Sequence, residues 1–170
     1  MSLERLWAGW RIPYIQRGDG GEIEVPEGLT LFEAIFQSDR PDDETYILWR
    51  GETCYAILNA FPYTSGHVMV LPQRGVPKLT DLTDDEYAEL WIGVRRATQA
   101  VEAAYQPHGM NIGANLGEGA GAGVPDHLHI HVMPRWNGDT NFMTTIANTR
   151  VMPETLGDTW RRLVEAWPGA

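Results

Sequence analysis

The sequence predicts an α+β fold built around a mostly antiparallel five-stranded sheet. Short β-rich runs lie on either side of one long helical segment, at 46–50, 53–58 and 67–71 before it and at 110–115 and 127–133 after it. Strands that follow one another with few intervening helices pair antiparallel, because parallel pairing needs a long crossover. The length of 170 residues predicts a single domain.

Caps and apolar spacing mark the helical segments. Residues 31–36 (LFEAIF) predict one or two helical turns. Thr83 and Glu86 match a capping box at the start of a helix that reaches Tyr105. Its predicted apolar face comprises Tyr87, Leu90, Trp91, Val94, Thr98, Val101 and Tyr105. A last helix is predicted from Pro153, and its apolar side comprises Leu156, Trp160, Leu163 and Trp167.

The connecting segments follow from turn-forming residues. Gly51 and Glu52 predict a hairpin turn between the first two strands. Residues 16–30 are rich in glycine and acidic residues and predict a loop, and residues 38–44 form a polar segment. Residues 1–15 carry several large apolar side chains, so we expect this terminus to pack on the body of the protein or on a partner chain.

Charge and cysteine content exclude several classes of function. The chain has 13 basic and 23 acidic residues and a net charge of -10, which predicts that it binds neither nucleic acid nor anionic membranes. Its single cysteine, Cys54, cannot form an intrachain disulfide, as is typical of a reducing compartment. No apolar stretch approaches the ~20 residues of a membrane-spanning helix. We therefore expect a cytoplasmic protein.

Three histidines fall within five residues on a predicted strand. Because side chains on a strand alternate between its faces, His127, His129 and His131 lie on one face. The opposite face is apolar and comprises Leu128, Ile130 and Val132. A row of imidazoles can bind a transition metal, or it can hold a nucleophilic imidazole oriented by its neighbours. The spacing alone leaves both interpretations open.

A glycine-rich loop precedes these histidines. Residues 117–123 (GEGAGAG) contain four glycines, and successive backbone N–H groups in such a loop can form an anion-binding nest. Together with the histidines, the loop indicates a phosphate group next to a nucleophilic imidazole.

The run His127-Leu-His129-Ile-His131-Val-Met resembles the signature of the histidine triad (HIT) family of nucleotide hydrolases and transferases. The similarity includes Asn59, the PYTSGH run that ends at His67, Asn115, the glycine loop and residues 134–142. The opening RLWAGWRIPYI is similar to the bacterial branch near the diadenosine tetraphosphate phosphorylases, with the fragile-histidine-triad hydrolases as a second close group.

The resemblance implies the HIT fold, with a long helix and a C-terminal helix on the five-stranded antiparallel sheet. The expected organisation is one HIT domain over residues 1–170. It comprises an N-terminal arm at 1–30, a core at 31–142 and a C-terminal helix at 153–167. The resemblance also implies a homodimer whose sheets join edge to edge.

The resemblance further implies catalytic roles. His129 would attack the α-phosphorus of a nucleotide and form a covalent nucleotidyl-imidazole. His131 would hydrogen-bond the phosphate oxygens, and His127 would orient the nucleophile and help to protonate the leaving group. His67 would lie beside the triad and order it. A histidine suits this role because its pKa lies near neutrality, so the ring is unprotonated at pH 7.

Substrate-binding positions follow in the same way. Asn59 falls where the family places the residue that binds the ribose hydroxyls, and Asn115 would contact the phosphate or the bridging oxygen. Gly121 and Gly123 of the glycine loop would offer backbone donors to phosphate. The base would pack against four apolar positions, Phe32, Ile35, Ile57 and Met69.

Two departures from the family bear on the chemistry. Many bacterial relatives carry a CxxC near residues 31–36 as half of a zinc site, and its absence here predicts no protein-bound metal; Mg²⁺ would arrive with the substrate. Gly123 stands where many relatives have a Gln, Ser or Thr that meets the phosphate. This difference leaves open whether water or orthophosphate resolves the intermediate.

The activity that fits these residues is nucleotidyl transfer or hydrolysis on a dinucleoside polyphosphate such as diadenosine tetraphosphate. Two alternatives stay open. One is a nucleoside phosphoramidate or aminoacyl-adenylate hydrolase, which shares the first half-reaction. The other is a nucleotide- or metal-binding module without turnover.

Overall fold

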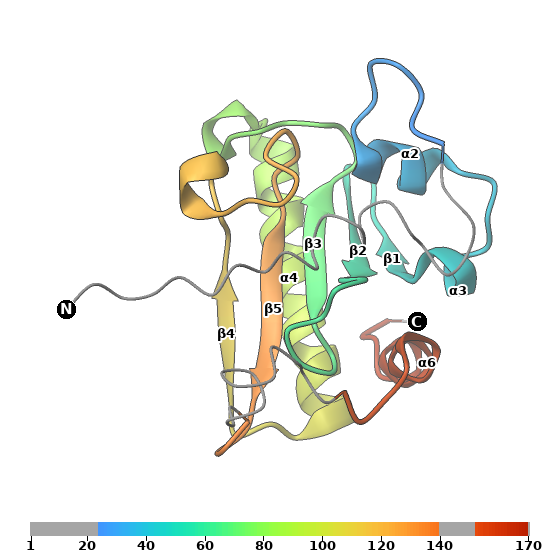
Figure 1. The fold of residues 1–170 in the computed structure, drawn as a ribbon, viewed down its shortest axis with the longest axis vertical. Coiled ribbons are helices and arrows are strands. Elements are labelled where there is room, and N and C mark those ends of the chain that lie inside the picture. Colours follow the sequence, from blue (N-terminus) through green and yellow to red (C-terminus); the bar gives the residue numbers. More distant parts are fainter. Residues whose placement is uncertain (1–23, 140–151, 170) are drawn as a thin grey trace, which may run out of the picture.

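The computed structural model describes residues 24–139 and 152–169, and its centre is one antiparallel sheet (Figure 1). The strand order across the sheet is β1-β2-β3-β5-β4, and every neighbouring pair is antiparallel. The strands are β1 (Ile47–Arg50), β2 (Cys54–Leu58), β3 (Val68–Pro72), β4 (Gly109–Gly113) and β5 (Ile130–Arg135). The predicted α+β class and the five-stranded sheet are confirmed.

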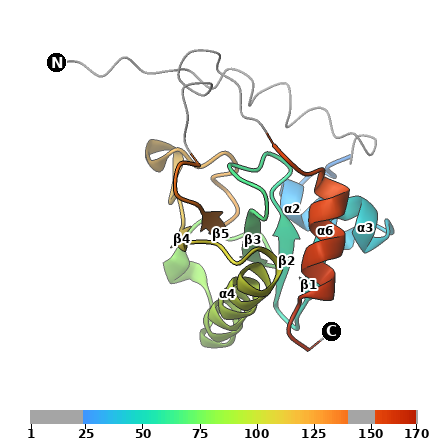
Figure 2. The ribbon, with the colours of Figure 1, turned by 90° about the horizontal axis from the view of Figure 1, so that it is seen from below.

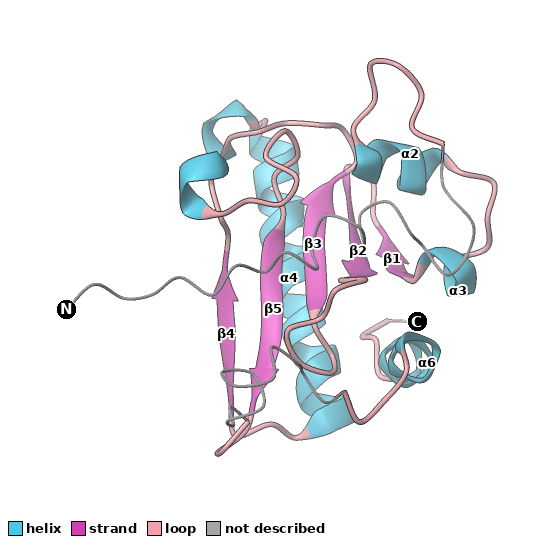
Figure 3. Cartoon of the chain, viewed as in Figure 1, coloured by secondary structure: helices cyan, strands magenta, loops and turns pink. Residues whose placement is uncertain are grey.

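The helices are distributed unequally around the sheet. They are α2 (Leu31–Gln37), α3 (Asp42–Thr45), α4 (Asp84–Tyr105) and α6 (Leu156–Glu165), with 3-10 turns η1 (Leu79–Asp81) and η2 (Glu118–Ala120). Helix α4 runs along one face of the sheet and α2 lies on the side opposite α4 (Figure 2). Helix α3 lies beyond β1 (Figure 3). Helix α6 contacts α3, α4 and β1. In the described part of the chain, no helix has the length and apolar character that crossing a membrane requires.

The strand residues alternate between two cores. On β2 and β3, Ala56, Leu58 and Val70 belong to the larger core beneath α4. Their neighbours Ile57 and Met69 belong to a smaller core on the opposite face, which contains Phe32 of α2. This period of two is the pattern expected of a sheet buried on both faces. The face away from α4 is therefore the one that can carry a site under α2.

Helices α2 and α4 each begin with a capping box. The Thr83 hydroxyl accepts the N–H of Glu86 while the Glu86 carboxylate accepts the N–H of Thr83, as the sequence predicts. The same reciprocal pair joins Thr30 and Glu33 at the start of α2. Each pair satisfies two N–H groups that the first helical turn would otherwise leave without partners.

Three predicted boundaries were wrong by a few residues. The strand predicted at 127–133 joins the ladder only from Ile130, because the N–H of Leu128 turns away to bond the carbonyl of Val76. The strand predicted at 110–115 spans 109–113, since its pairing with β5 ends at Gly113. The last helix begins at Leu156 rather than Pro153, because Thr155 caps it.

The predicted apolar face of α4 was too wide. Leu90, Val94 and Val101 are buried beneath the helix, but Tyr87 is 48% exposed and Trp91 is 41% exposed. These two aromatic rings contact each other on the outer side of the helix instead. The polar segment predicted at 38–44 also proved to contain most of the short helix α3.

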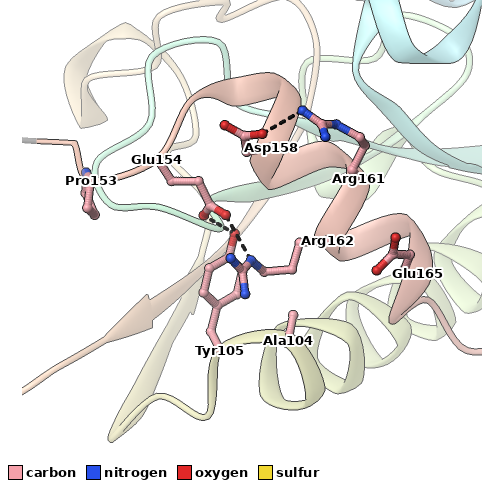
Figure 4. Close-up of a pocket in the computed structure, with 8 residues that line it drawn as sticks. All are labelled: Ala104, Tyr105, Pro153, Glu154, Asp158, Arg161, Arg162 and Glu165. Carbon is pink, nitrogen blue, oxygen red and sulfur yellow. Dashed lines mark hydrogen bonds and ion pairs between the residues drawn. The ribbon is translucent and has the colours of Figure 1, made fainter.

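Helix α6 is held by polar contacts from its middle turn and from the residues just before its start. The indole Nε1–H of Trp160 donates to the carbonyl of Ile47 on β1 at 2.8 Å. Glu154 accepts the Tyr105 hydroxyl at 2.7 Å and Nε–H of Arg162 at 2.9 Å, beside a surface pocket at the end of α4 (Figure 4). The predicted packing of residues 1–15 and the end of the predicted core, 140–142, lie outside the described residues.

Candidate functional site

One pocket gathers most of the predicted site. It has a volume of about 160 Å³ and lies on the sheet face opposite α4, between α2, β2, β3 and the glycine loop. Among its lining residues are Phe32, Ile35, Ile57, Asn59, Met69, Asn115, Gly121, Gly123, His129 and His131. The two remaining predicted residues, His67 and His127, are buried and contact the lining histidines from behind.

The face assignment of the three histidines is confirmed, although the ladder does not reach the first two. Leu128, Ile130 and Val132 lie in the core beneath α4. His129 and His131 point to the opposite face, where their ring centroids are 4.9 Å apart at an angle of 84°. Extended backbone alternates its side chains whether or not it is paired, so the predicted face survives the shorter strand.

A backbone carbonyl fixes the proton on His129. Its Nδ1 lies 2.8 Å from the carbonyl oxygen of His127, which can only accept, so Nδ1 carries the hydrogen. Nε2 of the neutral ring therefore keeps its lone pair. Burial lowers the pKa of His129 below the ordinary histidine value, and the bond to His127 offsets only part of this effect. The lowered pKa favours the neutral ring at pH 7, with a lone pair on Nε2.

A hydrogen bond from His67 favours the opposite tautomer for His131. The backbone N–H of Tyr63 donates to Nδ1 of His67 at 3.1 Å, so His67 carries its hydrogen on Nε2. That hydrogen is donated to Nδ1 of His131 at 2.9 Å. The neutral His131 ring then has its own hydrogen on Nε2. An N–H donor on His131 and a nitrogen lone pair on His129 consequently lie next to each other in the pocket.

Asn59 supports this arrangement from the turn before β3. Its Oδ1 accepts the N–H of Phe61 at 2.9 Å, and its Nδ2 lies 3.4 Å from Nδ1 of His67. The turn returns through Gly66, whose φ of +77° suits glycine and whose added Cβ would lie 2.9 Å from the Tyr105 ring. Asn59 therefore lines the pocket and also steadies His67.

His127 is held on both sides of its ring. Its Nε2 donates to the carbonyl of Pro72 at 2.9 Å, and its Nδ1 lies 2.6 Å from the Thr30 hydroxyl. Burial lowers the pKa of His127, against smaller opposing effects of Pro72 and Glu33. This geometry suits the orienting role that the resemblance implies, because the carbonyl of His127 receives Nδ1–H of His129.

Apolar side chains form the wall of the pocket away from the histidines. The sheet contributes Ile57 and Met69 to this wall, and α2 contributes Phe32 and Ile35. The Phe32 ring lies 5.4 Å from the His127 ring and 5.5 Å from the His129 ring. A flat apolar ligand such as a nucleobase fits such a wall.

The glycine loop borders the pocket opposite this wall. Gly121 and Gly123 line it, but the N–H of Gly121 bonds the carbonyl of Glu118 at 2.9 Å within η2. The N–H of Ala122 likewise bonds the carbonyl of Gly117 at 3.4 Å. In this conformation the N–H groups of Gly121 and Ala122 make hydrogen bonds within the loop, so they cannot also bind an anion, and only part of the predicted nest is available to phosphate.

Sequence reasoning missed several residues of the site. Thr45, Tyr46 and Phe61 also line the pocket, and no motif marks them. Tyr63 lines it too, and it lies in the PYTSGH run, but no role was predicted for it. Thr30 was assigned to a loop, although Thr30-x-x-Glu33 is the same capping-box signal that located the helix at Thr83. No group of three or more His, Cys, Asp or Glu side chains suited to a metal occurs among residues 24–139 and 152–169.

Known proteins with similar sequences and structures identify the family. The HIT domain model matches residues 40–138. The AP-4-A phosphorylase of Mycobacterium tuberculosis is 39% identical over 171 residues, which cover 98% of this chain and 85% of that protein. The asymmetrical bis(5'-nucleosyl)-tetraphosphatase of Schizosaccharomyces pombe is 40% identical over 93 residues, 55% of this chain and 50% of that protein.

A solved structure agrees with these matches. The crystal structure of a zinc-bound histidine triad family protein from Mycobacterium smegmatis superposes with a TM-score of 0.65 at 30% identity, covering 81% of this chain and 91% of that one. The family match includes the five strands, the buried histidines and the pocket residues from Thr45 onward, whereas α2 lies before the matched range. The chain therefore belongs to the HIT domain family.

Proposed function

We propose that this protein is an enzyme that cleaves dinucleoside polyphosphates such as diadenosine tetraphosphate through a covalent nucleotidyl-His129 intermediate. The observation that carries the proposal is the hydrogen bond from Nδ1 of His129 to the carbonyl of His127, which reserves Nε2 as a nucleophile beside the pocket. The names of the similar phosphorylase and tetraphosphatase support this substrate class.

The first step forms one bond and breaks another. Nε2 of His129 attacks the α-phosphorus, and the bond from that phosphorus to the bridging oxygen breaks. The departing nucleoside polyphosphate takes the electron pair. Nε2–H of His131 donates to a nonbridging oxygen, where negative charge develops in the transition state. A donor aimed at such an oxygen typically contributes about 10²–10³ in rate.

The second step releases the nucleotide. Orthophosphate or water attacks the same phosphorus, the bond to Nε2 breaks, and His129 returns to its starting form. A covalent intermediate divides one difficult displacement into two easier ones. We propose orthophosphate as the acceptor, since the relative that matches nearly the whole chain is named a phosphorylase. Asn59 would hold the ribose, Asn115 the phosphate chain, and the wall of Phe32 and Ile57 the base.

We also propose that the enzyme holds no metal of its own and receives Mg²⁺ with the polyphosphate, whose charge the ion would neutralise. The cytoplasmic location and the single-domain organisation stay predictions. A homodimer joined through β4 is proposed because β4 is an edge strand with exposed Ile112 and Leu116 nearby. A stable monomer at micromolar concentration, measured by light scattering, would contradict the dimer.

One assay tests the function. The protein is incubated with diadenosine tetraphosphate and Mg²⁺, with and without orthophosphate, and the products are separated by chromatography. ADP and ATP that form only with phosphate are the expected result. AMP and ATP in both tubes would identify water as the acceptor. The absence of cleavage in both tubes would overturn the proposed substrate class and direct the same assay to nucleoside phosphoramidates.

The intermediate requires a separate measurement. Acid quenching during turnover should trap protein whose mass has increased by one nucleotidyl group. His129→Asn should show neither the adduct nor turnover, while equilibrium dialysis still detects nucleotide binding. His108→Asn is the matched control, because His108 lies in the loop before β4 with an exposed side chain and should leave both readouts unchanged. An adduct that persists in His129→Asn would refute the assignment.

A further inference from the structure

The start of α2 meets the first histidine of the triad. The Thr30 hydroxyl lies 2.6 Å from Nδ1 of His127, across 97 positions of sequence. The same oxygen accepts the N–H of Glu33 at 3.2 Å, as the cap of the helix. Since that lone pair receives a hydrogen, the one hydrogen of the hydroxyl is available for His127.

The opposite side of the ring fixes the direction of this bond. Nε2 of His127 lies 2.9 Å from the carbonyl of Pro72, and a carbonyl only accepts. Nε2 therefore carries the hydrogen of the neutral ring, and Nδ1 must accept from Thr30. The two bonds agree on one tautomer, and together they hold the plane of a ring that is 1% exposed.

Thr30 is itself held in place. The Glu33 carboxylate accepts the N–H of Thr30 at 2.8 Å, and hydrogen bonds from Thr30 and Gly75 outweigh burial and keep the pKa of Glu33 below its usual range. A Cβ added to Gly75 would lie 2.6 Å from Cγ2 of Thr30 and 2.9 Å from Oε2 of Glu33. The chain after β3 thus closes tightly over the start of α2.

We propose that Thr30 is a positioning residue for the nucleophile. Its hydroxyl orients the His127 ring, and the backbone of His127 provides the carbonyl that receives Nδ1–H of His129. The same hydroxyl begins α2, whose Phe32 contacts both rings. The Thr30 hydroxyl oxygen therefore fixes the position of α2 relative to Nε2 of His129. This inference rests on the proposed function only for its effect on turnover.

The test compares three substitutions at Thr30. Thr30→Val removes the hydroxyl at nearly constant volume, and kcat should fall about 10- to 100-fold with little change in KM, because small displacements of a reacting group have effects of that size. Thr30→Ser retains the hydroxyl and should restore turnover. Thr30→Asp retains the helix cap but has no hydrogen to give at pH 7, so its turnover should stay low.

Thr83→Val is the matched control. It removes the same capping box from α4, away from the pocket, and so measures what the loss of a cap does by itself. We expect Thr83→Val to lower thermal stability while kcat stays within about threefold of the original value. If Thr30→Val lowers kcat no more than Thr83→Val does, Thr30 acts only as a cap and the inference is wrong.

A spectroscopic readout separates this inference from the proposed function. In the original protein, ¹⁵N imidazole shifts of His127 should show the tautomer with hydrogen on Nε2. Thr30→Asp, which retains the cap, should move these shifts toward the doubly protonated ring. Unchanged shifts in Thr30→Asp would overturn the inference even if diadenosine tetraphosphate is cleaved, and changed shifts would support it even if that substrate proves wrong.

Discussion

His67 offers the sharpest test of how the site is built, because it acts on the substrate only through another residue. Its side chain is 1% exposed. Its Nδ1 accepts a hydrogen bond from the backbone N–H of Tyr63, and its Nε2 donates one to Nδ1 of His131. His67→Leu introduces an apolar side chain of similar size that can neither accept nor donate a hydrogen bond. The variant removes the hydrogen bond from Nε2 of His67 that favours the His131 tautomer with its hydrogen on Nε2.

The expected magnitudes follow from the groups left behind. The N–H of Tyr63 and Nδ1 of His131 each lose their hydrogen bond to His67, as does the more distant Nδ2 of Asn59, and each such loss at a buried polar group costs about 1–3 kcal/mol. The two closer bonds alone should therefore lower the free energy of unfolding by roughly 2–6 kcal/mol, which most domains, stable by about 5–15 kcal/mol, withstand. If His131 then places its hydrogen on Nδ1, the donor to the phosphate is lost, and kcat should fall about 10²–10³-fold.

The assay compares His67→Leu with His67→Gln in urea unfolding and in steady-state cleavage of diadenosine tetraphosphate. A glutamine amide can accept from Tyr63 and donate to His131, so His67→Gln should retain much more activity than His67→Leu. His108→Leu removes one exposed hydrogen bond, from the N–H of Asn137 to Nδ1 of His108, so it should leave turnover unchanged and lower the free energy of unfolding by no more than about 1 kcal/mol. Turnover of His67→Leu within about threefold of the original enzyme would refute the assigned relay, since a lost donor is expected to have a far larger effect.

Three further predictions concern protons and carboxylates. Because burial lowers the pKa of His129, kcat/KM should stay level as pH falls through 6.5 and decline only below it; a midpoint above 6.5 would contradict the assignment. Arg74 holds the pKa of Glu86 at about 2, below its unfolded value, so this carboxylate stabilises the fold above pH ~4.5 and loses that effect toward pH 2. Glu86→Gln keeps the capping pattern and should lower the free energy of unfolding by about 1–2 kcal/mol at pH 7, less than the full shift because Arg74 is half exposed; urea unfolding at pH 3 should show a much smaller difference. Burial opposes ionisation of Glu89, but hydrogen bonds from Thr53 and its neighbours outweigh burial and keep the pKa of Glu89 low. Glu89→Gln should therefore cost about 1–3 kcal/mol at pH 7 in the same measurement, and an unchanged midpoint would show that this turn needs no charge.

Short-range regularities carried the correct sequence predictions. The alternation of His129 with Ile130 and His131 predicted which face each side chain occupies, and the structure confirms it. The capping box at Thr83 located the start of the long helix to the residue. Both signals depend on backbone geometry over two to four positions, so the sequence alone contains them.

The errors arose where contacts between residues far apart in the sequence determine burial, strand boundaries or hydrogen-bond partners. Tyr87 and Trp91 follow the helical spacing, but α4 buries a narrower stripe than that spacing allows, because only the row through Leu90 and Val94 faces the sheet. Strand β5 begins at Ile130, later than predicted, because the N–H of Leu128 bonds the carbonyl of Val76, in the segment after β3. The Thr30 cap can be predicted locally, but its second partner, His127, depends on the fold.

The most consequential information missing from the sequence is the position of three hydrogens. His127, His129 and His131 are chemically alike in the sequence, and the fold makes them different by ending each hydrogen-bond chain at a backbone group: the carbonyls of Pro72 and His127, and the N–H of Tyr63. A backbone carbonyl only accepts and an amide only donates, so neither can reverse its role as side chains can. Each chain therefore has one direction, and the two histidines that line the pocket receive opposite tautomers. The proposed attack on phosphorus needs a ring nitrogen with a free lone pair beside an N–H donor, and these opposite tautomers place the two next to each other in the pocket.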